Sequence, residues 1–570
     1  MKKLINDANK VVEEMVAGLT LTYGGLQRLS DENVILRCDS DEVRATSVAV
    51  ISGGGSGHEP AHAGYVGAGM LSAAVLGDVF TSPSTDAILA AIHAVSGAAG
   101  ALLIVKNYTG DQLNFRLAAE IARAEGYQVE MAVVADDVSL PYAGSHAGRR
   151  GLAGTVLVHK VAGAAAAEGL PLVDVGELAR HAAARVGTMG VALGACTIPV
   201  AGAPNFALAD TEMELGLGIH GEPGVERCVI EPVDGIIERI LGKILDDAPP
   251  QRGDRVVLMV NNLGGTTTME LAIVARRAIE LLELQGLNVE RVYMGTFLSA
   301  LEMPGVSISL LREVDDRTLG LLDAPTCAPA WPNAAATPRT PAVSNISTAA
   351  PKLTRDSTRG TSGHEAGPPI FDGIRRAASA LIAAEARLTQ LDRQVGDGDI
   401  GISLQRGAKA VLTTLDELRG ESPAAVFRAL GFLLRRAVAG TSGALYAVFL
   451  FRAAASLEGS PPADINRWAD ALDAGIAGIA EFGGARSGDR TMLDALIPSA
   501  EVLRAELSAG RPIRHALLAV AAAGRSGADA TAAMTARRGR SSYLGTRVVG
   551  VNDPGAEAVA TWLEAIARCS

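Results

Sequence analysis

Residues 47–64 read SVAVISGGGSGHEPAHAG, an apolar run that leads directly into a glycine-rich loop. The β-branched residues at 47–52 predict a buried strand, and a loop at the carboxyl end of such a strand is the usual ligand position in an open α/β sheet. His58 lies inside this loop, which favours a functional role, whereas His62 fits a core role equally well. We therefore expect a ligand site at the end of this strand.

The same kind of run recurs along the first part of the chain. Short β-branched segments alternate with longer helical patterns, for instance at 268–285, and the further predicted strands are 101–108, 129–135, 255–263 and 291–297. Such alternation is typical of an α/β fold with largely parallel, buried strands. The pattern is compatible with one domain and with two subdomains.

Two more loops carry candidate catalytic side chains. KNYTGD places Lys106 and Asp111 just past a predicted strand, although Asp/Gly turns are also common there. TEMELGLGIHGEPG (211–224) holds His220 between glycines with Glu222 close by, and a mobile surface turn is the alternative interpretation. Its formal match to the GxGxxG motif is interpreted as a false positive, because no apolar strand precedes it and a proline follows at once.

The chain divides at a segment of different composition. Residues 325–369 are rich in Pro, Ser, Thr and Ala without periodicity, which predicts an interdomain linker. After it, apolar residues recur at helical spacing and no strand is recognisable, so this part is predicted to be an all-α domain of roughly seven or eight helices. We place the boundaries at 1–330 for the α/β domain, 331–367 for the linker and 368–570 for the helical domain.

The sharpest local pattern of the helical domain is LDRQVGDGDIG at 391–401. Asp392, Asp397 and Asp399 follow one another closely, with glycines between them. Like charges repel, and a hard divalent cation reverses that penalty, so the three carboxylates indicate a metal site. An Asp/Gly turn and a calcium loop are the alternatives, but the spacing is not that of an EF-hand. Since no GxxxxGK[ST] motif occurs, the sequence is not that of a P-loop enzyme.

Three glycine-rich junctions precede predicted helices in the same domain: GTSGALY (440–446), SGDRTMLDAL (487–496), and GRSSYLG with NDPGAEA (539–558). Singly, each is compatible with an ordinary helix cap. With the Asp-rich loop they supply several helix N-termini and three carboxylates, which suits Mg²⁺ and a nucleotide. Most histidines precede the linker, so acid–base chemistry is expected in the α/β domain.

Composition excludes several other classes of protein. The chain has 570 residues, a net charge of −12 and only 4% aromatic residues, which argues against nucleic-acid binding. The longest apolar stretch, GALYAVFLF, is too short to span a membrane, and the charged N-terminus is not a secretory signal, so a cytoplasmic protein is expected. No CxxC pair occurs, which predicts neither a disulfide framework nor a zinc site among Cys38, Cys196, Cys228, Cys327 and Cys569.

Eight of these segments, in this order, resemble the dihydroxyacetone kinase family in its single-chain, ATP-dependent form: GGGSGHEP, KNYTGD, GLGIHGEPG, GDGDIG, TSGALY, GDRTMLDAL, GRSSYLG and NDPGA. The resemblance covers nearly the whole chain outside the linker. It implies a homodimeric kinase that transfers the γ-phosphate of ATP, with Mg²⁺, to the terminal hydroxyl of a short ketose such as dihydroxyacetone. The helical domain would then be an eight-helix nucleotide-binding barrel.

The resemblance also implies roles for individual residues. His220 would attack the ketone carbon and hold the ketose as a covalent hemiaminal, and Asp111, helped by His58, would take the proton of the attacking hydroxyl. The substrate-binding residues would be Gly55, Ser56, Gly57, His58, Lys106 and Asp111. Asp392, Asp397 and Asp399 would hold two Mg²⁺ ions, and the nucleotide would be bound by Ile400, Gly401, Ile402, Ser403, Ser442, Gly443, Met492, Arg540, Asp553, Pro554 and Gly555.

One departure from the family pattern and several alternatives accompany this interpretation. Relatives often carry hydroxyl or amide residues after GDGD, where this chain has Ile400 and Ile402, so phosphate contacts are expected there from backbone N–H groups. Four-carbon erythruloses are alternative substrates. A phosphocarrier-dependent subunit and a non-catalytic ketose sensor are alternative functions, and a flavin-dinucleotide cyclising side activity stays open. Fusion of both domains in one chain raises their effective concentration, which favours direct use of ATP.

Overall fold

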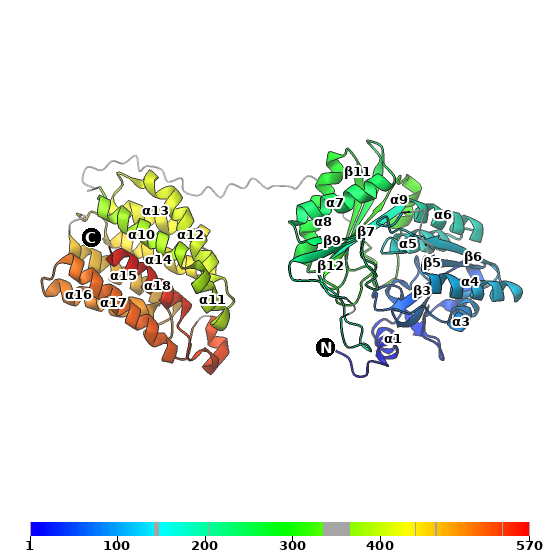
Figure 1. The fold of residues 1–570 in the computed structure, drawn as a ribbon, viewed down its shortest axis with the longest axis horizontal. Coiled ribbons are helices and arrows are strands. Elements are labelled where there is room, and N and C mark those ends of the chain that lie inside the picture. The colour runs from blue at the N-terminus through cyan, green and yellow to red at the C-terminus, as the bar shows by residue number, and fades with distance from the viewer. Residues whose placement is uncertain are drawn as a thin grey trace. The chain divides into compact units, whose positions relative to one another are not determined.

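The structure, a computed structural model, describes residues 2–141, 148–204, 206–333, 365–438, 440–461, 464–538 and 540–568. The chain forms two compact units, Met1–Ser344 and Asn345–Ser570 (Figure 1). The first unit contains two β-sheets with helices, and the described part of the second contains helices only. Most of the predicted linker, at 334–364, lies outside the described residues.

Six strands form the first sheet of the α/β unit, in the order β1-β2-β4-β3-β5-β6. The neighbours from β4 to β6 are parallel, and β1 and β2 add an antiparallel edge. β3 and β5 are buried along their whole length, as their apolar sequences predict. The strands are β1 (Leu26–Arg28), β2 (Val34–Arg37), β3 (Ala49–Ser56), β4 (Ala73–Val79), β5 (Ala101–Lys106) and β6 (Val129–Val134).

The second sheet has the order β11-β10-β12-β7-β8-β9, and only β10 and β11 are parallel. The prediction of largely parallel strands is therefore right for the first sheet and wrong for the second. β7 and β12 are buried throughout. A strand that is covered on both faces is apolar whether it runs parallel or antiparallel to its neighbours, so its sequence does not indicate its direction. The strands are β7 (Val186–Ala192), β8 (Glu212–Leu215), β9 (Glu226–Val229), β10 (Arg255–Asn262), β11 (Asn288–Gly295) and β12 (Gly305–Leu311).

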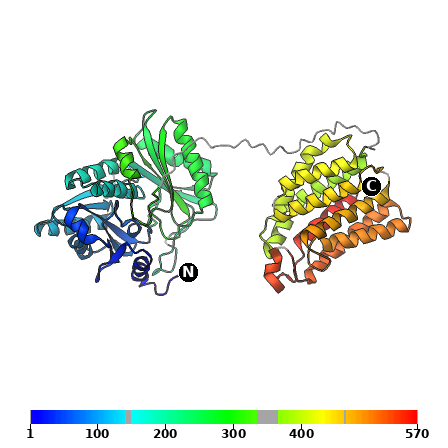
Figure 2. The ribbon, with the colours of Figure 1, turned by 180° about the vertical axis from the view of Figure 1, so that it is seen from behind.

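The helices of this unit cover the sheets in layers, which Figure 2 shows from behind. α3 and α4 share a core with one face of the first sheet, and α7 and α8 share another with the second sheet. α5 and α6 lie in a core that contains residues of both sheets, so α5 is buried on almost every side. The helices are α1 (Val11–Thr22), α2 (Ser40–Thr46), η1 (Ala63–Tyr65), α3 (Thr85–Val95), α4 (Thr109–Ala124), α5 (Thr155–Ala167), α6 (Leu172–Arg185), α7 (Val233–Asp247), α8 (Thr268–Leu284) and α9 (Asp316–Asp323).

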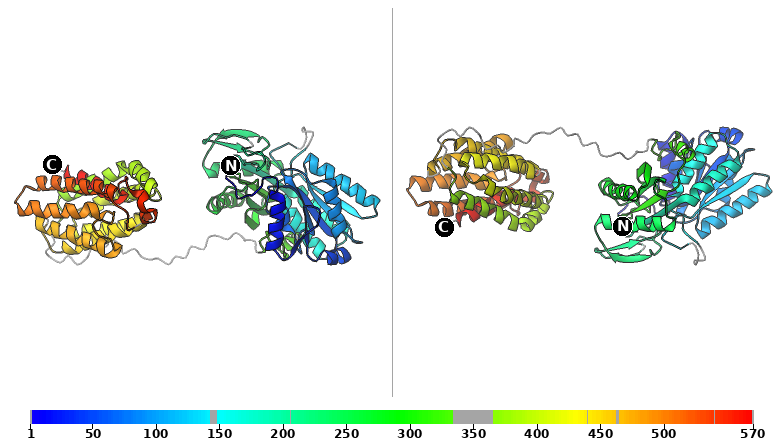
Figure 3. Two further views of the ribbon diagram at one scale, coloured as in Figure 1. Left: turned by 90° about the horizontal axis from the view of Figure 1, so that it is seen from below. Right: turned by 90° about the horizontal axis from the view of Figure 1, so that it is seen from above.

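The second unit is a closed ring of helices (Figure 3). Neighbours pack in succession from α12 to α18, α10 packs on α12, and α10 also packs on α18, which closes the predicted eight-helix barrel. No helix within the described ranges is long and apolar enough to cross a membrane. The helices are α10 (Pro368–Ala383), α11 (Glu385–Val395), α12 (Ile400–Thr414), η2 (Leu415–Leu418), α13 (Pro423–Ala437), α14 (Gly440–Ser456), α15 (Ile465–Gly483), α16 (Leu493–Ser508), α17 (Ile513–Ala530), η3 (Thr531–Ala533), η4 (Arg540–Val548) and α18 (Pro554–Ala567).

The strand ends set the position of the candidate site in the α/β unit. β3 and β5 are adjacent and parallel, so the loop after Ser56 and the end of β5 at Lys106 meet at the same sheet edge. β8 ends at Leu215 and leads into the segment that carries His220. A short strand therefore does precede the GxGxxG-like segment, contrary to the prediction. Since β8 pairs antiparallel and is followed by β9 rather than a helix, the segment is still no dinucleotide loop.

Candidate active site

The loop after β3 is built from residues that leave little room for side chains. A Cβ atom at Gly55 would lie 2.5 Å from the backbone nitrogen of Thr81, and Gly57 has a φ of +98°, which favours glycine. Ser56 donates its hydroxyl hydrogen to the carbonyl oxygen of Gly77 at 2.7 Å, so this hydroxyl is committed to the neighbouring strand. The loop therefore presents mainly backbone atoms to a ligand.

His58 is fully buried and held in one tautomer. Its Nδ1 lies 2.7 Å from the carbonyl oxygen of Ser299, and because a carbonyl can only accept, Nδ1 carries the hydrogen. Its ring stacks on Phe80 with a centroid separation of 4.9 Å. Burial, together with the charge of Lys106, holds the pKa of His58 well below 6.5. Nε2 of His58 is therefore a neutral lone-pair acceptor, with no partner among the described residues.

His220 is oriented by a carboxylate two residues further along. Nδ1 of His220 lies 2.7 Å from Oε1 of Glu222, whose Oε2 accepts the backbone N–H of His220 at 3.0 Å. Burial by itself raises the pKa of Glu222, but the hydrogen bonds from His220 outweigh it and lower that pKa to about 2. The ionised Glu222 holds a hydrogen on Nδ1, which leaves the lone pair on Nε2. The ring lies edge-on to those of Tyr108, His58 and Phe80, with centroids 4.8, 4.9 and 5.2 Å away.

Lys106, at the end of β5, and Asp111, in the first turn of α4, are the other charged candidates at this end of the sheet. Both side chains are buried. Burial lowers the pKa of Lys106, and the negative charge of Asp111 opposes the shift. Buried polar atoms are normally paired, so several unpaired ones in one place indicate a polar ligand. Those without a hydrogen-bond partner among the described residues include His58 Nε2, His62 Nε2, Lys106 Nζ, Tyr108 Oη and Asp111 Oδ1.

The three aspartates of the helical unit lie together between α11 and α12. Asp392 is buried, and its Oδ2 accepts the backbone N–H groups of Asp399 at 2.9 Å and Ile400 at 3.3 Å. Asp397 and Asp399 are exposed, and one ligand oxygen from each of the three residues lies within 4.8 Å of the others. All three donors are carboxylate oxygens, the ligand type that Mg²⁺ prefers, so the cluster fits this ion.

Several predicted nucleotide-binding residues lie at the starts of helices that pack together. Ile400, at the start of α12, lies in one apolar cluster with Tyr446 of α14 and Ala558 of α18. A Cβ atom at Gly401 would overlap the carbonyl oxygen of Glu385, and one at Gly443 would overlap a backbone oxygen of α13's end. These glycines are therefore required for close helix packing. Of the neighbouring predicted residues, Ile402 is exposed, Ser403 is buried and Ser442 is half-buried.

The starts of α16 and α18 adjoin one another. A Cβ atom at Gly555 would lie 3.7 Å from the backbone nitrogen of Met492, the residue before α16. Asp553 caps α18, since its Oδ2 accepts the N–H of Ala556 at 2.8 Å, and Pro554 is the first residue of the helix. Burial raises the pKa of Asp553 to about 6. The side chain of Arg540, at the start of η4, and Gly539 lie outside the described residues.

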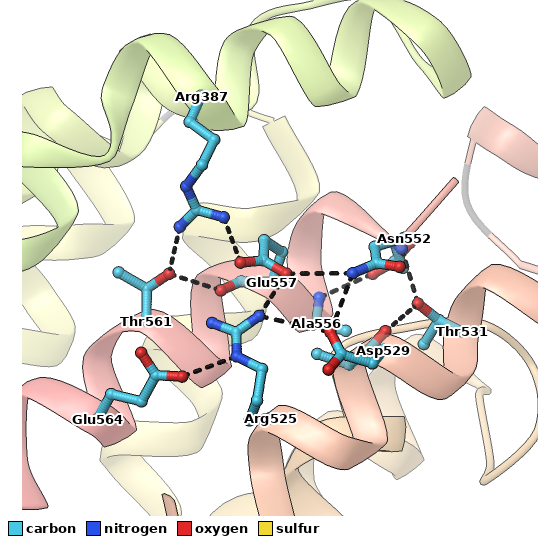
Figure 4. Close-up of polar contacts among 11 residues, drawn as sticks. Arg387, Arg525, Asp529, Thr531, Asn552, Ala556, Glu557, Thr561 and Glu564 are labelled. Atoms are coloured by element: carbon cyan, nitrogen blue, oxygen red, sulfur yellow. Dashed lines mark hydrogen bonds and ion pairs between the residues drawn. The ribbon is translucent and has the colours of Figure 1, made fainter. Parts of the chain in front are cut away.

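A buried carboxylate joins the helices that carry these loops. Figure 4 shows Glu557 of α18 between Arg387 of α11 and Arg525 of α17. Arg525 donates to Glu557 Oε2 at 2.7 Å and to Glu564 at 2.7 Å, and Asn552 donates to Glu557 at 3.4 Å. Burial raises the pKa of Glu557, and the two arginines outweigh it and lower that pKa. The carboxylate of Glu557 thereby links α18, which Asp553 caps, to α11, which precedes the aspartate cluster.

Replacing Glu557 with alanine is expected to destabilise the helical unit by about 3 kcal/mol, because both arginines lose a buried partner. Urea unfolding followed by circular dichroism measures the loss. Glu564→Ala, which removes a more exposed partner of Arg525, is the control and should cost less than about 1 kcal/mol. Equal losses in the two variants contradict the assignment.

The sequence pattern did not identify every residue around the pocket. Phe80, which stacks on His58, and Ser299, which fixes its tautomer, come from loops that carried no signal. Tyr108 lies within the predicted KNYTGD segment but was not singled out. For Glu222, the sequence offered only its position two residues after His220, and in the structure its carboxylate contacts the imidazole ring of His220.

The fold and these two clusters together define a protein with a buried, histidine-rich polar cluster in an α/β unit and an acidic cluster suited to a metal ion in a helical barrel. Two family profiles match the chain: the Dak1 domain over residues 17–330 and the DAK2 domain over residues 394–568. The chain belongs to the dihydroxyacetone kinase family, as the resemblance predicted.

Relatives are similar over nearly the whole length. The chain is 44% identical to the human triokinase/FMN cyclase, with 99% of this chain and 98% of the human protein covered. It is 37% identical to the dihydroxyacetone kinase of Citrobacter freundii, with 99% and 98% covered. The crystal structure of the C. freundii enzyme in complex with AMP-PNP and Mg²⁺ matches with a TM-score of 0.63 and 35% identity, covering 100% of both chains.

Proposed function

We propose that this protein is an ATP-dependent kinase that phosphorylates the terminal hydroxyl of a short ketose, dihydroxyacetone, to give dihydroxyacetone phosphate. The observation that carries the proposal is the pair of histidines at the pocket: Glu222 holds His220 with its lone pair on Nε2, and the Nε2 of His58 next to it is a buried, unpaired acceptor. A nucleophile beside a proton acceptor suits a carbonyl substrate that also carries a hydroxyl.

His220 acts first in this proposal. Its Nε2 attacks the ketone carbon and the carbonyl π electrons move to the oxygen, which takes up a proton from water, so the ketose is held as a hemiaminal whose imidazole ring is positively charged. Glu222 is ionised and contacts Nδ1, so it stabilises the positive charge that develops on the imidazole ring. Glycerol has no carbonyl to trap, which explains how a ketose is selected over the corresponding polyol.

The remaining residues of the pocket act on the hydroxyl that accepts the phosphoryl group. Asp111 Oδ1, helped by His58 Nε2, accepts the hydroxyl proton. The ammonium group of Lys106 orients the ketose by hydrogen bonding and balances the charge of Asp111. The backbone of Gly55, Ser56 and Gly57 lines the ketose.

The helical unit supplies the nucleotide site in this proposal. Asp392, Asp397 and Asp399 hold Mg²⁺, which neutralises phosphate charge when bound. Asp392 also fixes the start of α12 through two backbone N–H groups, which orients that helix N-terminus. The nucleotide contacts are assigned to Ile400, Gly401, Ile402, Ser403, Ser442, Gly443, Met492, Arg540, Asp553, Pro554 and Gly555.

A direct assay tests the proposed function. The protein is incubated with MgATP and dihydroxyacetone, and ADP is measured by a coupled enzyme reaction. ADP formation that needs the ketose and no second protein is expected, and it excludes a phosphocarrier-dependent subunit. No turnover with any three- or four-carbon ketose contradicts the proposal. Comparing dihydroxyacetone with D- and L-erythrulose then distinguishes three-carbon from four-carbon substrates.

The pH dependence of kcat/KM for the ketose follows from two shifted groups. His58 acts as an acceptor only when neutral, and burial holds its pKa well below 6.5, so protonation of His58 is not expected to lower activity near pH 6.5. Lys106 acts as an ammonium ion, and burial lowers its pKa from 10.5, so activity is expected to fall at alkaline pH before 10.5. A pH–rate profile measures the alkaline limb, and activity that stays unchanged up to pH 10.5 contradicts the assignment of Lys106.

Three further expectations rest on the sequence and the family resemblance. We infer domain boundaries at 1–330, 331–367 and 368–570, a homodimeric assembly and a cytoplasmic location. Analytical ultracentrifugation of the full chain tests the assembly, and fractionation of the producing cells tests the location.

A further inference from the structure

The hydroxyl group of Ser52 contacts two buried histidines, His62 and His159. Ser52, in the middle of β3, donates its only hydroxyl hydrogen to the carbonyl oxygen of Ile104 at 2.7 Å. Nε2 of His159 lies 3.0 Å from this Ser52 oxygen, and Nδ1 of His62 lies 3.4 Å from it. Because the Ser52 hydrogen is already used, its oxygen can only accept, so both imidazoles donate to it.

The tautomer of His62 follows from this arrangement. Its hydrogen is on Nδ1, so its Nε2 carries a lone pair and needs a donor. Nε2 of His62 is buried and has no partner among the described residues. Burial, together with the charge of Lys106, holds the pKa of His62 well below 6.5, so the ring is a neutral acceptor. An unpaired buried acceptor of this kind is costly and calls for an explanation.

The ammonium group of Lys106 borders the same space as Nε2 of His62. A Cβ atom at Gly54 would lie 3.1 Å from Lys106 Nζ and 3.4 Å from His62 Nε2, so both atoms border the same point beside Gly54. Nζ of Lys106 also has no hydrogen-bond partner among the described residues. Gly54 is therefore the residue whose missing side chain lets the lysine and the histidine approach one another.

We propose that His62 is a positioning residue of the ketose site: the lone pair on its neutral Nε2 lies beside Lys106 Nζ across the space left by Gly54, stabilises the ammonium form of the lysine and holds it against the substrate. Ser52 and His159 fix His62 in the accepting tautomer. The inference rests on the proposed function, since it assigns Lys106 to the ketose.

The electrostatic surroundings of Lys106 agree with this role. Burial disfavours its ammonium form, whereas Asp111 of α4, Glu222 and Asp136 favour it by their charge. The other groups that face the lysine are the imidazoles of His58 and His159, which burial keeps neutral. A neutral acceptor at His62 stabilises the ammonium without a second carboxylate, and its removal lets Lys106 lose its proton at lower pH.

The test compares His62→Leu with His62→Gln in the full-length protein. The leucine removes the acceptor, and the glutamine retains an amide oxygen that accepts a hydrogen bond. We expect His62→Leu to lower kcat/KM for the ketose about tenfold or more, with KM for ATP unchanged, and to move the alkaline limb of the pH profile down by about one unit. His62→Gln is expected to recover most of the loss. His93→Leu, at an exposed histidine of α3, is the matched control.

A second measurement needs no turnover and separates this inference from the proposed function. The Cε resonance of Lys106 in protein labelled with [13C]lysine, assigned with Lys106→Arg, reports its titration directly. We expect the midpoint to fall in His62→Leu and, to a smaller extent, in Ser52→Ala, which releases the tautomer of His62 and serves where the leucine variant fails to fold. Failure of ketose phosphorylation by the wild-type protein contradicts only the proposed function. An unmoved Lys106 titration, or equal activity losses in the leucine and glutamine variants, overturns the role of His62.

Discussion

Replacement of His220 by alanine is expected to lower kcat/KM for dihydroxyacetone by about a thousandfold or more, because the variant loses the nucleophile that holds the ketose. KM for ATP should stay unchanged, since His220 belongs to the α/β unit and the proposed nucleotide-binding residues belong to the helical one. Steady-state kinetics with either substrate varied measures both effects. Calorimetric titration with the ketose should show that binding is lost together with turnover.

Two variants frame this prediction. Glu222→Gln retains a hydrogen-bond acceptor for Nδ1 of His220 but removes the charge, so a smaller loss of about tenfold to a hundredfold is expected. His181→Ala, at a histidine of α6 outside the pocket, should behave like the wild type. If His220→Ala keeps more than about a tenth of the activity, the proposed trapping of the ketose by this histidine is wrong.

The parts of the site that the sequence predicted are those that depend on local order along the chain. Asp392, Asp397 and Asp399 stand so close in sequence that one turn brings their oxygens together. His58 and Lys106 each follow an apolar strand, and adjacent parallel strands end at one edge of a sheet. In both cases the position of the side chain follows from a short stretch of backbone, so the sequence pattern was sufficient to predict it.

The remaining contacts depend on tertiary packing that no local pattern encodes. Ser299 fixes the tautomer of His58 across 241 residues of chain, and Phe80 reaches the same ring from another loop. Arg387, Arg525 and Glu557 are ordinary charged residues of helices until the closed barrel brings them together. The antiparallel second sheet was missed for a related reason, since burial on both faces erases the difference between strand directions.

Replacement of Asp397 by asparagine is expected to abolish most turnover and to raise the Mg²⁺ concentration for half-maximal activity by about a hundredfold or more, because one of three clustered carboxylates is lost. Asp397 is the suitable position, since it is exposed, whereas Asp392 also holds the start of α12 and its loss would disturb the fold. Kinetics at varied Mg²⁺ measure the shift, and Asp372→Asn, an exposed position of α10, is the control.

Thermal unfolding of Asp397→Asn gives an independent test, because loss of a metal ligand and loss of a contact between helices change the unfolding midpoint differently. Without Mg²⁺, three carboxylates within 4.8 Å repel one another, so removal of one charge should leave the midpoint unchanged or raise it. With Mg²⁺, the wild-type midpoint should rise by mass action, because the folded state binds the ion, and this rise should shrink in the variant. An Mg²⁺-dependent rise equal to that of the wild type contradicts the metal site. Glu557→Ala should show the reverse pattern, a lower midpoint that Mg²⁺ still raises, because its carboxylate holds helices rather than the ion.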